Sequence, residues 1–141
     1  MNKYIIEDLV VAEIMSTNLV TVDAETSANY IKSIFDNLDI RHLPVVNEGK
    51  VLGIISKEDM RKLAHGLSFN TTGRTLSSKM MDAITAKEIM TPQPVCIHSM
   101  DSVQHAAKLF LKHHFHCLPV LENGKIVGIV TTFDLLRYAF K

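Results

Sequence analysis

Two short segments of the sequence place a hydroxyl and a carboxylate three residues apart. They are Ser56-Lys57-Glu58-Asp59 and Thr131-Thr132-Phe133-Asp134. Each follows a β-branched run and opens a helical pattern, so each is expected at a helix start. A carboxylate there suits the vicinal hydroxyls of a ribose, and the unpaired amides, joined by the Ser56 or Thr131 hydroxyl, suit a phosphate. The same spacing is that of a helix capping box, and both interpretations stay open.

The two segments belong to a duplication of the whole chain. A shift of about 75 residues brings the two halves into register without a gap, as a tandem repeat requires. The matching pairs include Glu13-Ile14-Met15 with Glu88-Ile89-Met90, Leu43-Pro44-Val45 with Leu118-Pro119-Val120, Gly53-Ile54 with Gly128-Ile129, and Asp59 with Asp134. The sequence therefore predicts a first unit over residues 1–65 with an N-terminal helix, a linker over 66–85, and a second unit over 86–141.

Each unit has the pattern of a β-α-β-β-α element order. Val, Ile and Thr runs predict the strands, apolar residues at helical spacing predict the helices, and Asn123-Gly124 in the second copy is a strong hairpin signal. Asp101 and Gln104 predict a cap for the helix of the second copy. The fold class is mixed α/β (α+β), and units of this size are expected to pack together with pseudo-two-fold symmetry because each would be marginal alone. The predicted elements are strands at 19–22 and 95–97, hairpins at 43–55 and 118–130, final helices at 57–65 and 132–140, and a short linker helix near 78–84.

These motifs together resemble one known family. Two copies of Ile-Met, a β-branched strand, an amphipathic helix, Leu-Pro-Val, a glycine turn and Gly-Ile-(Ile/Val)-(Ser/Thr)-x-x-Asp are similar to cystathionine-β-synthase (CBS) domains. The tandem looks like a CBS pair, or Bateman module, and the resemblance omits only the N-terminus and the linker. It implies a sensor that binds AMP, ADP, ATP, S-adenosylmethionine or a related compound in the seam between the units. It also implies further association into a disc-like dimer.

The resemblance assigns further roles to basic residues before Leu-Pro-Val. In AMP-binding relatives such residues reach the ligand phosphates, and Arg41, His42 and His116 occupy these positions here. A guanidinium pairs with phosphate through two hydrogen bonds, whereas an imidazole carries a full charge only when protonated. The first copy is therefore better equipped for a polyphosphate. The alternative is that these are solvated charges at loop ends.

An adenine ring needs an apolar slot, because its faces make no hydrogen bonds. Val20 and Val95 on the first strands, with Ile54 and Ile129 before the hydroxyl residues, are placed to form such walls. The alternative is that all four are plain core residues.

Neither a metal site nor catalysis is predicted. The cluster at residues 113–117, with Cys96 and His98, offers imidazole and thiolate groups, but no Cys-x-x-Cys or His-x-x-x-His pair accompanies it. A helix end and a buried thiol explain these residues. The chain has no glycine-rich phosphate loop, Gly-x-Ser-x-Gly elbow or His-Glu-x-x-His motif, so neither catalytic residues nor a catalytic cofactor are expected.

Composition narrows the class of protein further. Of 141 residues, 15 are basic and 15 acidic, and this balance argues against a nucleic-acid binder that works through a general field. The apolar runs are far shorter than the ~20 residues that a bilayer requires. Two cysteines fit a reducing compartment, and acidic residues near the start do not fit a signal peptide. A cytoplasmic protein without membrane contact is expected.

The sequence thus predicts a regulatory module that binds an adenosine-containing ligand and signals occupancy to an effector protein that the sequence does not identify. A homodimer is expected. A ligand-free interaction or dimerisation module is the first alternative, and a metal-responsive protein is the second.

Overall fold

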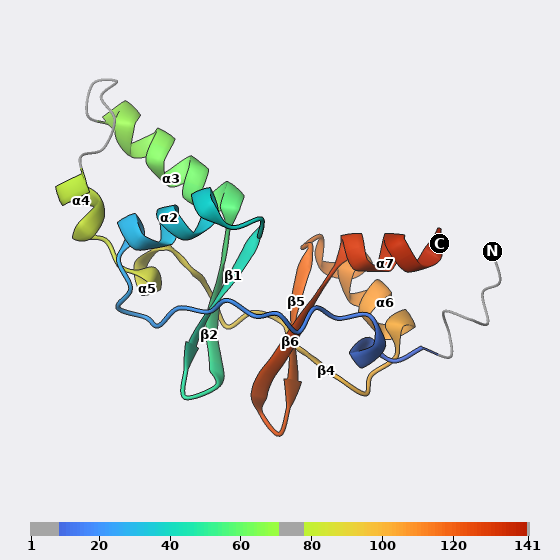
Figure 1. The fold of residues 1–141 in the computed structure, drawn as a ribbon. Helices are drawn as coiled ribbons and strands as arrows, with labels where there is room; N and C mark the ends of the chain where they lie inside the picture. Colours follow the sequence, from blue (N-terminus) through green and yellow to red (C-terminus); the bar gives the residue numbers. More distant parts are fainter. Residues whose placement is uncertain (1–8, 71–77, 141) are drawn as a thin grey trace. The chain divides into compact units, whose positions relative to one another are not determined.

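The computed structural model describes residues 9–70 and 78–140. The chain divides into two compact units (Figure 1), one of Val20–Gln93 and one of Met1–Leu19 with Pro94–Lys141. We name them the first-repeat unit and the second-repeat unit, after the repeat that supplies the hairpin of each. Both are mixed α+β, and each contains one three-stranded sheet. The predicted fold class is therefore confirmed.

The first-repeat unit is built on the antiparallel hairpin of β1 (His42–Asn47) and β2 (Lys50–Ser56). The short strand β3 (Thr91–Pro92) pairs antiparallel with β2. Buried residues of α2 (Ala28–Asn37), among them Ile31 and Phe35, share a core with residues of both hairpin strands because they recur on one helical face. The remaining helices are α3 (Lys57–Asn70), α4 (Ser78–Asp82) and α5 (Ala86–Ile89).

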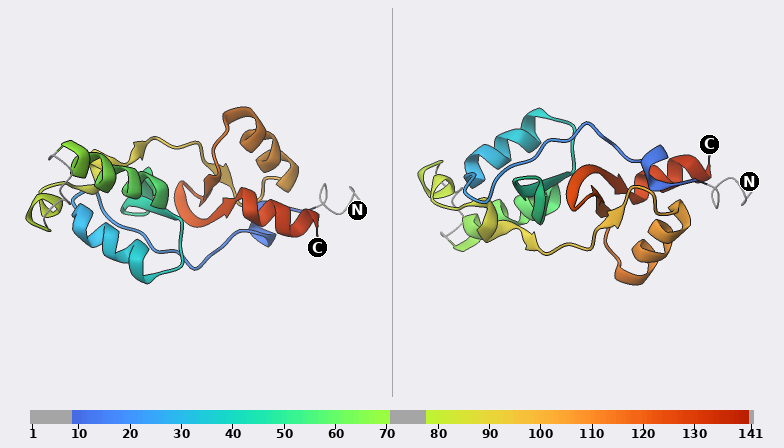
Figure 2. Two further views of the ribbon diagram at one scale, coloured as in Figure 1. Left: turned by 90° about the horizontal axis from the view of Figure 1, so that it is seen from above. Right: turned by 90° about the horizontal axis from the view of Figure 1, so that it is seen from below.

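The second-repeat unit has the equivalent hairpin of β5 (Cys117–Glu122) and β6 (Lys125–Thr131). Here the third strand, β4 (Ile97–His98), runs parallel to β5. Its helices are α6 (Val103–His113) and α7 (Thr132–Ala139), with a 3-10 turn, η1 (Val11–Glu13), from the N-terminal segment. Figure 2 shows η1 in blue beside α7, where the Tyr138 hydroxyl donates to the main-chain oxygen of Glu13 at 3.2 Å.

Both predicted hairpins are confirmed, and the same turn closes each. Glu48 and Gly49 have φ of 50° and 83°, and Asn123 and Gly124 have φ of 53° and 79°. Two successive left-handed residues are the signature of a type I′ turn, whose twist matches that of the flanking strands. The glycines are needed here because other residues reach this conformation at a cost.

The segment at the start of each repeat lies in the compact unit that contains the hairpin of the other repeat. The amides of Val11 and Ala12 donate to the oxygens of Asp101 and Ser99, and Val103 donates to Leu9. The same three hydrogen bonds recur in the first-repeat unit, from Ala86 to Thr26, from Lys87 to Ala24 and from Ala28 to Ile84. The compact units therefore divide the chain at different places from the repeat boundaries that the sequence shows.

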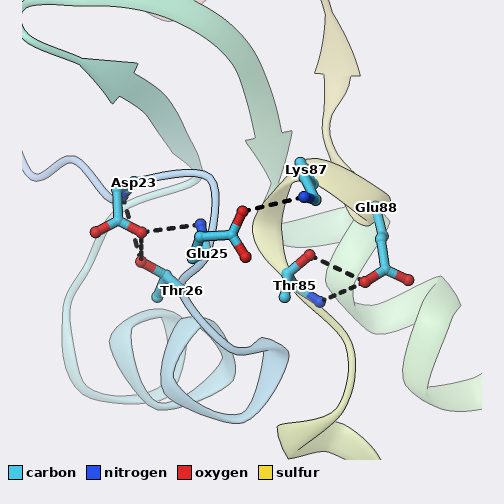
Figure 3. A network of polar contacts seen from close by, with 6 residues as sticks. All are labelled: Asp23, Glu25, Thr26, Thr85, Lys87 and Glu88. Atoms are coloured by element: carbon cyan, nitrogen blue, oxygen red, sulfur yellow. Dashed lines mark hydrogen bonds and ion pairs between the residues drawn. The ribbon is translucent and has the colours of Figure 1, made fainter.

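Side chains reinforce this exchange in the first-repeat unit. Figure 3 shows Glu25 and Lys87 pointing toward each other, with Oε1 and Nζ 3.0 Å apart. Thr85 caps α5 by donating its amide and hydroxyl to Oε1 of Glu88 at 3.3 and 3.0 Å. The loop before α2 and the start of α5 are thereby held together.

Several sequence predictions of local structure were wrong. The predicted strand at 19–22 has one ladder partner, a parallel bridge between Val22 and Val45, and its counterpart at 95–97 is replaced by β4. Helix α3 continues through Asn70, so the first part of the predicted linker is helical. The predicted N-terminal helix stays a prediction, because residues 1–8 lie outside the described part, and the first element of the described part is the 3-10 turn η1.

The predicted cap of α6 was also misplaced. The N-cap is Ser102, whose hydroxyl accepts the amide of His105 at 3.0 Å, as Ser27 accepts that of Tyr30 in α2. Asp101 instead accepts the amide of His98 at 2.9 Å and closes the turn before the helix. Among the helices described over 9–70 and 78–140, none has the length and apolar character needed to cross a bilayer.

Candidate ligand site

Both predicted carboxylates close capping boxes at their helix starts. At α3 the amide of Asp59 donates to Ser56 Oγ at 2.9 Å, and the amide of Ser56 donates to Asp59 Oδ2 at 3.3 Å. At α7 the amide of Asp134 donates to Thr131 Oγ1 at 3.2 Å, and the amide and hydroxyl of Thr131 donate to Asp134 Oδ2 at 2.9 and 3.1 Å. The capping interpretation therefore describes both carboxylates in this structure.

Capping leaves each carboxylate with spare acceptors. In both pairs the hydrogen bonds made within the described part of the chain end at Oδ2, so Oδ1 keeps its lone pairs. An ionised carboxylate has about four acceptor positions, which is more than its cap uses. Both aspartates are half-buried. The same side chain could therefore accept hydrogen bonds from its cap and from a diol.

The two caps differ in strength. Asp59 receives a single bond of 3.3 Å, which lies beyond the usual range for an N–H donor, whereas Asp134 receives two bonds of 2.9 and 3.1 Å. Rotating Asp59 away from its helix therefore breaks less than rotating Asp134.

Main-chain hydrogen bonds bring the predicted basic residues to the same helix starts. The amide of Lys57 donates to the oxygen of Arg41 at 2.8 Å, and in the ladder His42 lies opposite Ser56. The structure therefore gathers Arg41, His42, Ser56 and Asp59 at one corner of the first-repeat unit. Arg41 is exposed, which leaves its guanidinium accessible to an anion.

The second-repeat unit builds the matching corner with fewer charges. The amide of Thr132 donates to the oxygen of His116 at 3.1 Å, and Cys117 lies opposite Thr131 in the ladder. His116 is exposed and joins Thr131 and Asp134. A neutral buried thiol at Cys117 takes the ladder position that His42 has in the other unit.

Two of the four predicted apolar walls lie beside these corners. Ile54 and Ser56 are two residues apart on β2, so they face the same side of the sheet, opposite the fully buried Ile55. Ile129 and Thr131 have the same relation on β6. Both isoleucines are half-buried and lie outside the described core clusters, which leaves them available as apolar contacts.

The other two predicted walls have different surroundings. Val20 packs against the core of the first-repeat unit, and Val95 is 38% exposed. Neither lies in a strand of the structure, because the predicted first strands are nearly absent. The structure therefore does not bring Val20 and Val95 to the helix starts through any strand pairing.

Sequence reasoning passed over Ser16 and Thr91. Each follows Ile-Met in its repeat and pairs with the wall isoleucine of a hairpin, Ser16 with Ile129 and Thr91 with Ile54. Both are exposed, so their hydroxyls are accessible beside the apolar contacts. Their equivalent places in the repeat were the signal that could have identified them.

The histidine and cysteine cluster has a structural explanation. His113 stacks on Phe115 with ring centroids 5.2 Å apart, and His114 ends α6 in the left-handed conformation. Burial raises the pKa of the Cys117 thiol to about 12, helped by the nearby Asp134, and burial also raises the pKa of Cys96. Thiols held neutral are poor zinc ligands. Across residues 9–70 and 78–140, no three His, Cys, Asp or Glu side chains are grouped so that they could hold a metal ion.

Comparison with known proteins identifies the family that the chain resembles. The model of the CBS domain matches residues 11–66 and 86–141. A CBS domain-containing protein of Dictyostelium discoideum is 32% identical over 135 residues, which cover 94% of this chain and 92% of that protein. L-Aspartate semialdehyde sulfurtransferase of Methanocaldococcus jannaschii is 39% identical over 70 residues, but these cover 48% of this chain and 14% of the enzyme. The chain thus matches a small part of that enzyme.

Two similar solved structures contain adenosyl compounds. The CBS domain pair of protein MJ0100, in complex with 5′-methylthioadenosine and S-adenosyl-L-methionine, has a TM-score of 0.74 and 28% identity, covering 93% of this chain and 95% of that one. CBSX2 in complex with AMP has a TM-score of 0.75 and 25% identity, covering 92% and 95%. Both similarities extend over nearly the whole chain.

Proposed function

The chain belongs to the CBS domain family, and from this we propose that it is a regulatory module whose two helix-start corners bind an adenosine-containing ligand. The observation that carries the proposal is a duplicated carboxylate whose hydrogen bonds to described residues end at Oδ2, set beside a hydroxyl, a basic residue and a half-buried isoleucine. A diol, a phosphate and an adenine ring each find a complementary group there. The adenosyl ligands of MJ0100 and CBSX2 support the same ligand class.

The two corners are proposed to prefer different ligands. Arg41 and His42 give the first-repeat corner a permanent positive charge and an imidazole, which suits the phosphates of AMP, ADP or ATP. The second-repeat corner has His116 as its basic residue and a neutral thiol beside it, which suits a ligand without phosphate such as S-adenosylmethionine or 5′-methylthioadenosine. The ligand is regulatory, and no catalytic role is assigned to it.

Output passes to a separate effector protein in this proposal. The ligand acts as a switch because it binds one arrangement of the chain better than another, and that difference in affinity sets the size of the signal. The module acts in the cytoplasm as a homodimer, and the free thiols of Cys96 and Cys117 fit a reducing compartment.

Calorimetric titration and thermal melting test the ligand proposal. Free ligand at roughly 100 times its Kd stabilises the folded state by about 2.7 kcal/mol, which melting detects readily. AMP is expected to raise the melting temperature, whereas 2′,3′-dideoxy-AMP, which lacks the diol, is expected to raise it far less. The same contrast applies to 5′-methylthioadenosine and its dideoxy analogue.

Substitutions test whether the carboxylates bind the ligand. Asp59→Asn keeps a capping oxygen but removes the charged diol acceptor, so it is expected to weaken AMP binding without unfolding α3. Glu58→Gln is the matched control, because Glu58 is an exposed neighbour on the same turn that pairs with Arg61. Equal binding of AMP by Asp59→Asn and wild type would contradict the proposal.

The ligand-free interaction module is the second candidate function. It is favoured by the fact that both carboxylates already close capping boxes and both hydroxyls accept a helix amide. Under this alternative, AMP, ATP, S-adenosylmethionine and 5′-methylthioadenosine all produce no heat and no change in melting temperature. Titration of the four compounds therefore separates the two candidates.

A further inference from the structure

Helix α6, drawn in orange in Figure 1, exposes a row of basic side chains. Three apolar residues bury one face of this helix in the core of the second-repeat unit. The opposite face is exposed and carries His105, Lys108, Leu111 and Lys112. Residues three and four positions apart are neighbours on a helix, so these four side chains form one continuous row. We call them the α6 basic face.

The positive charge of this face is not neutralised by nearby carboxylates. Residues 102–121 contain neither aspartate nor glutamate. Across residues 9–70 and 78–140, neither Lys108 nor Lys112 forms an ion pair. Attraction to the negative end of the helix dipole falls off within the last turn, so it accounts for Lys112 but not for Lys108. The α6 basic face is therefore available to an anionic partner.

The equivalent helix of the first repeat shows that the fold does not require these charges. Helix α2 begins at the same kind of serine N-cap and buries the equivalent face. At the positions of the two lysines it has the uncharged residues Ser33 and Asn37. Its own Lys32 pairs with Asp36 at 2.8 Å. The uncompensated charge of α6 is thus a feature of this surface rather than of the fold that both units share.

The spacing of the exposed residues matches that of a partner helix. Lys108 and Lys112 are about 6 Å apart along the axis, and two glutamates four residues apart on another helix have the same separation. Leu111 lies beside the lysines and is 78% exposed, so it offers an apolar contact that a partner leucine can cover. A helix with glutamates and leucines on one face therefore complements the α6 basic face in both charge and position.

Other anionic partners fit this face less well. A membrane surface attracts clusters of about 4–8 Lys or Arg residues, and the α6 basic face has only Lys108 and Lys112. Binding of a nucleic acid depends mainly on the number of phosphates that Lys and Arg neutralise, and two lysines neutralise few. Neither of these partners makes use of the exposed Leu111. An acidic helix uses both the charges and the leucine.

We propose that the α6 basic face binds an acidic amphipathic helix of the effector protein. This inference deepens the proposed function by naming the chemistry of the effector, and it rests on that proposal only in calling the bound protein an effector. Attraction between exposed charges raises the rate of encounter with an acidic partner and is screened by salt. Binding is therefore expected to weaken as the salt concentration rises.

Fluorescence anisotropy with the whole chain and a labelled helical peptide of Glu-Ala-Ala-Leu repeats tests the proposal. This peptide places glutamates four residues apart with leucines beside them. Wild type is expected to bind it at ~0.1 M salt and to bind it roughly tenfold or more weakly at ~1 M salt, because the Debye length falls from about 10 Å to about 3 Å. The same peptide with Gln in place of Glu is expected to bind far more weakly than the glutamate peptide.

Substitutions of the two lysines test whether the peptide binds at α6. Lys108→Glu with Lys112→Glu is expected to weaken binding roughly tenfold or more, and Lys108→Gln with Lys112→Gln to weaken it less. The matched control is Lys50→Glu with Lys125→Glu, which changes the net charge equally at two exposed lysines of the hairpins and should bind the peptide like wild type. Circular dichroism checks that each variant keeps its helices.

The proposal would be overturned by a wild type that does not bind the glutamate peptide, by equal binding of the glutamate and glutamine peptides, or by a charge-reversal variant that binds like wild type. Tighter binding of a single-stranded oligonucleotide or of phosphatidylserine vesicles would also overturn it, and would assign the face to phosphates. Melting with AMP on the same samples keeps the ligand proposal separate, because the lysines of α6 lie outside both helix-start corners.

Discussion

The first-repeat and second-repeat units share their backbone plan but differ at the surfaces that a ligand or partner would meet. At the helix starts, Asp59 is held by one long hydrogen bond and Asp134 by two short ones. On the solvent side of the following helix, the first copy has the Glu58–Arg61 ion pair and the second has the exposed apolar side chains of Phe133 and Leu136. The duplication has kept the hydrogen bonds that build each unit and has let the exposed positions diverge.

Buried hydrogen bonds are kept and exposed positions differ because substitutions at the two kinds of position cost different amounts of stability. A main-chain hydrogen bond lost from a buried ladder leaves two unpaired groups, whereas a change at an exposed position usually alters stability very little. The first-repeat unit accordingly has the corner with more charged side chains, in which Asp59 is held by one long hydrogen bond, and the second-repeat unit has the corner with fewer charges and the exposed apolar residues of α7.

The largest effect on stability is expected from substituting Gly128 and Gly53, the glycines that face Met15 and Met90. A Cβ at Gly128 would lie 2.7 Å from Met15 Sδ and 2.8 Å from the main-chain oxygen of Ser16, which is fixed by pairing with Ile129. Because that oxygen cannot move without breaking the ladder, Gly128→Ala is expected to lower the free energy of unfolding by about 3 kcal/mol in a urea titration.

Gly53→Ala is the equivalent substitution in the first-repeat unit. Its Cβ would meet side-chain atoms of Met90, including Cβ at 2.9 Å and Cγ at 2.7 Å, and no main-chain atom is among its nearest neighbours. A smaller loss is expected, and Met90→Ala in the same chain should recover part of it. Equal losses for the two glycine variants would contradict the distinction between a main-chain neighbour and a side-chain neighbour.

The next largest effect is the pH dependence of stability caused by Cys117, whose equivalent in the first repeat is His42. Because the pKa of Cys117 is raised from 9.0 to about 12, the folded state retains a proton that the unfolded state loses in this range. The free energy of unfolding is therefore expected to fall by up to about 1.4 kcal/mol per pH unit as the pH rises above 9.0 toward 12. Well below pH 9.0, as at pH 7, this thiol contributes no pH dependence because both states keep the proton.

Chemical unfolding of wild type and Cys117→Ala at a series of alkaline pH values isolates this contribution, since other titrating groups are common to both. The difference in slope should appear above pH 9.0 and be absent at pH 7. A wild type whose slope matches that of Cys117→Ala throughout would show that the thiol titrates normally in the folded protein.

The smallest expected effect compares the two caps. Thr131→Ala removes the acceptor of the Asp134 amide together with a hydroxyl donated to its carboxylate, and Ser56→Ala removes the acceptor of the Asp59 amide. Losses of about 1.5 and about 0.7 kcal/mol are expected in thermal unfolding, in that order, within the range of helix caps. The reverse order would contradict the stronger hold on Asp134 that the distances indicate.

Much of the local structure could be predicted from the sequence. Asn123-Gly124 and Glu48-Gly49 identify both hairpins because few residues tolerate two successive left-handed conformations. The Ser/Thr-x-x-Asp spacing places the starts of α3 and α7 because the cap is a contact over three residues. The predicted strand at 19–22 failed, since β-branched residues form a strand only where a neighbouring chain supplies hydrogen bonds, and Val22 alone has one.

The candidate site was partly predictable for the same reason. Ser56, Asp59, Thr131 and Asp134 came from local spacing, and pairing within the hairpins brought Arg41, His42 and His116 beside them. The pairing of Ser16 and Thr91 with strands far along the chain leaves no pattern in the neighbouring residues, and their equivalent places in the repeat were the one available signal. The role of Val95 stays a prediction, because the residue lies outside a strand and is 38% exposed.

The sequence by itself determined the duplication, the turns and the helix starts, because these depend on contacts over a few residues and on the identity of glycine or a capping group. Only the tertiary structure decided that each leading segment joins the unit of the other repeat, since those bonds join main-chain atoms that every residue possesses. It also decided which apolar residues of α7 face the core. Leu135 and Leu136 are adjacent and identical in chemistry, yet Leu135 is half-buried against the core of the second-repeat unit and Leu136 is 56% exposed.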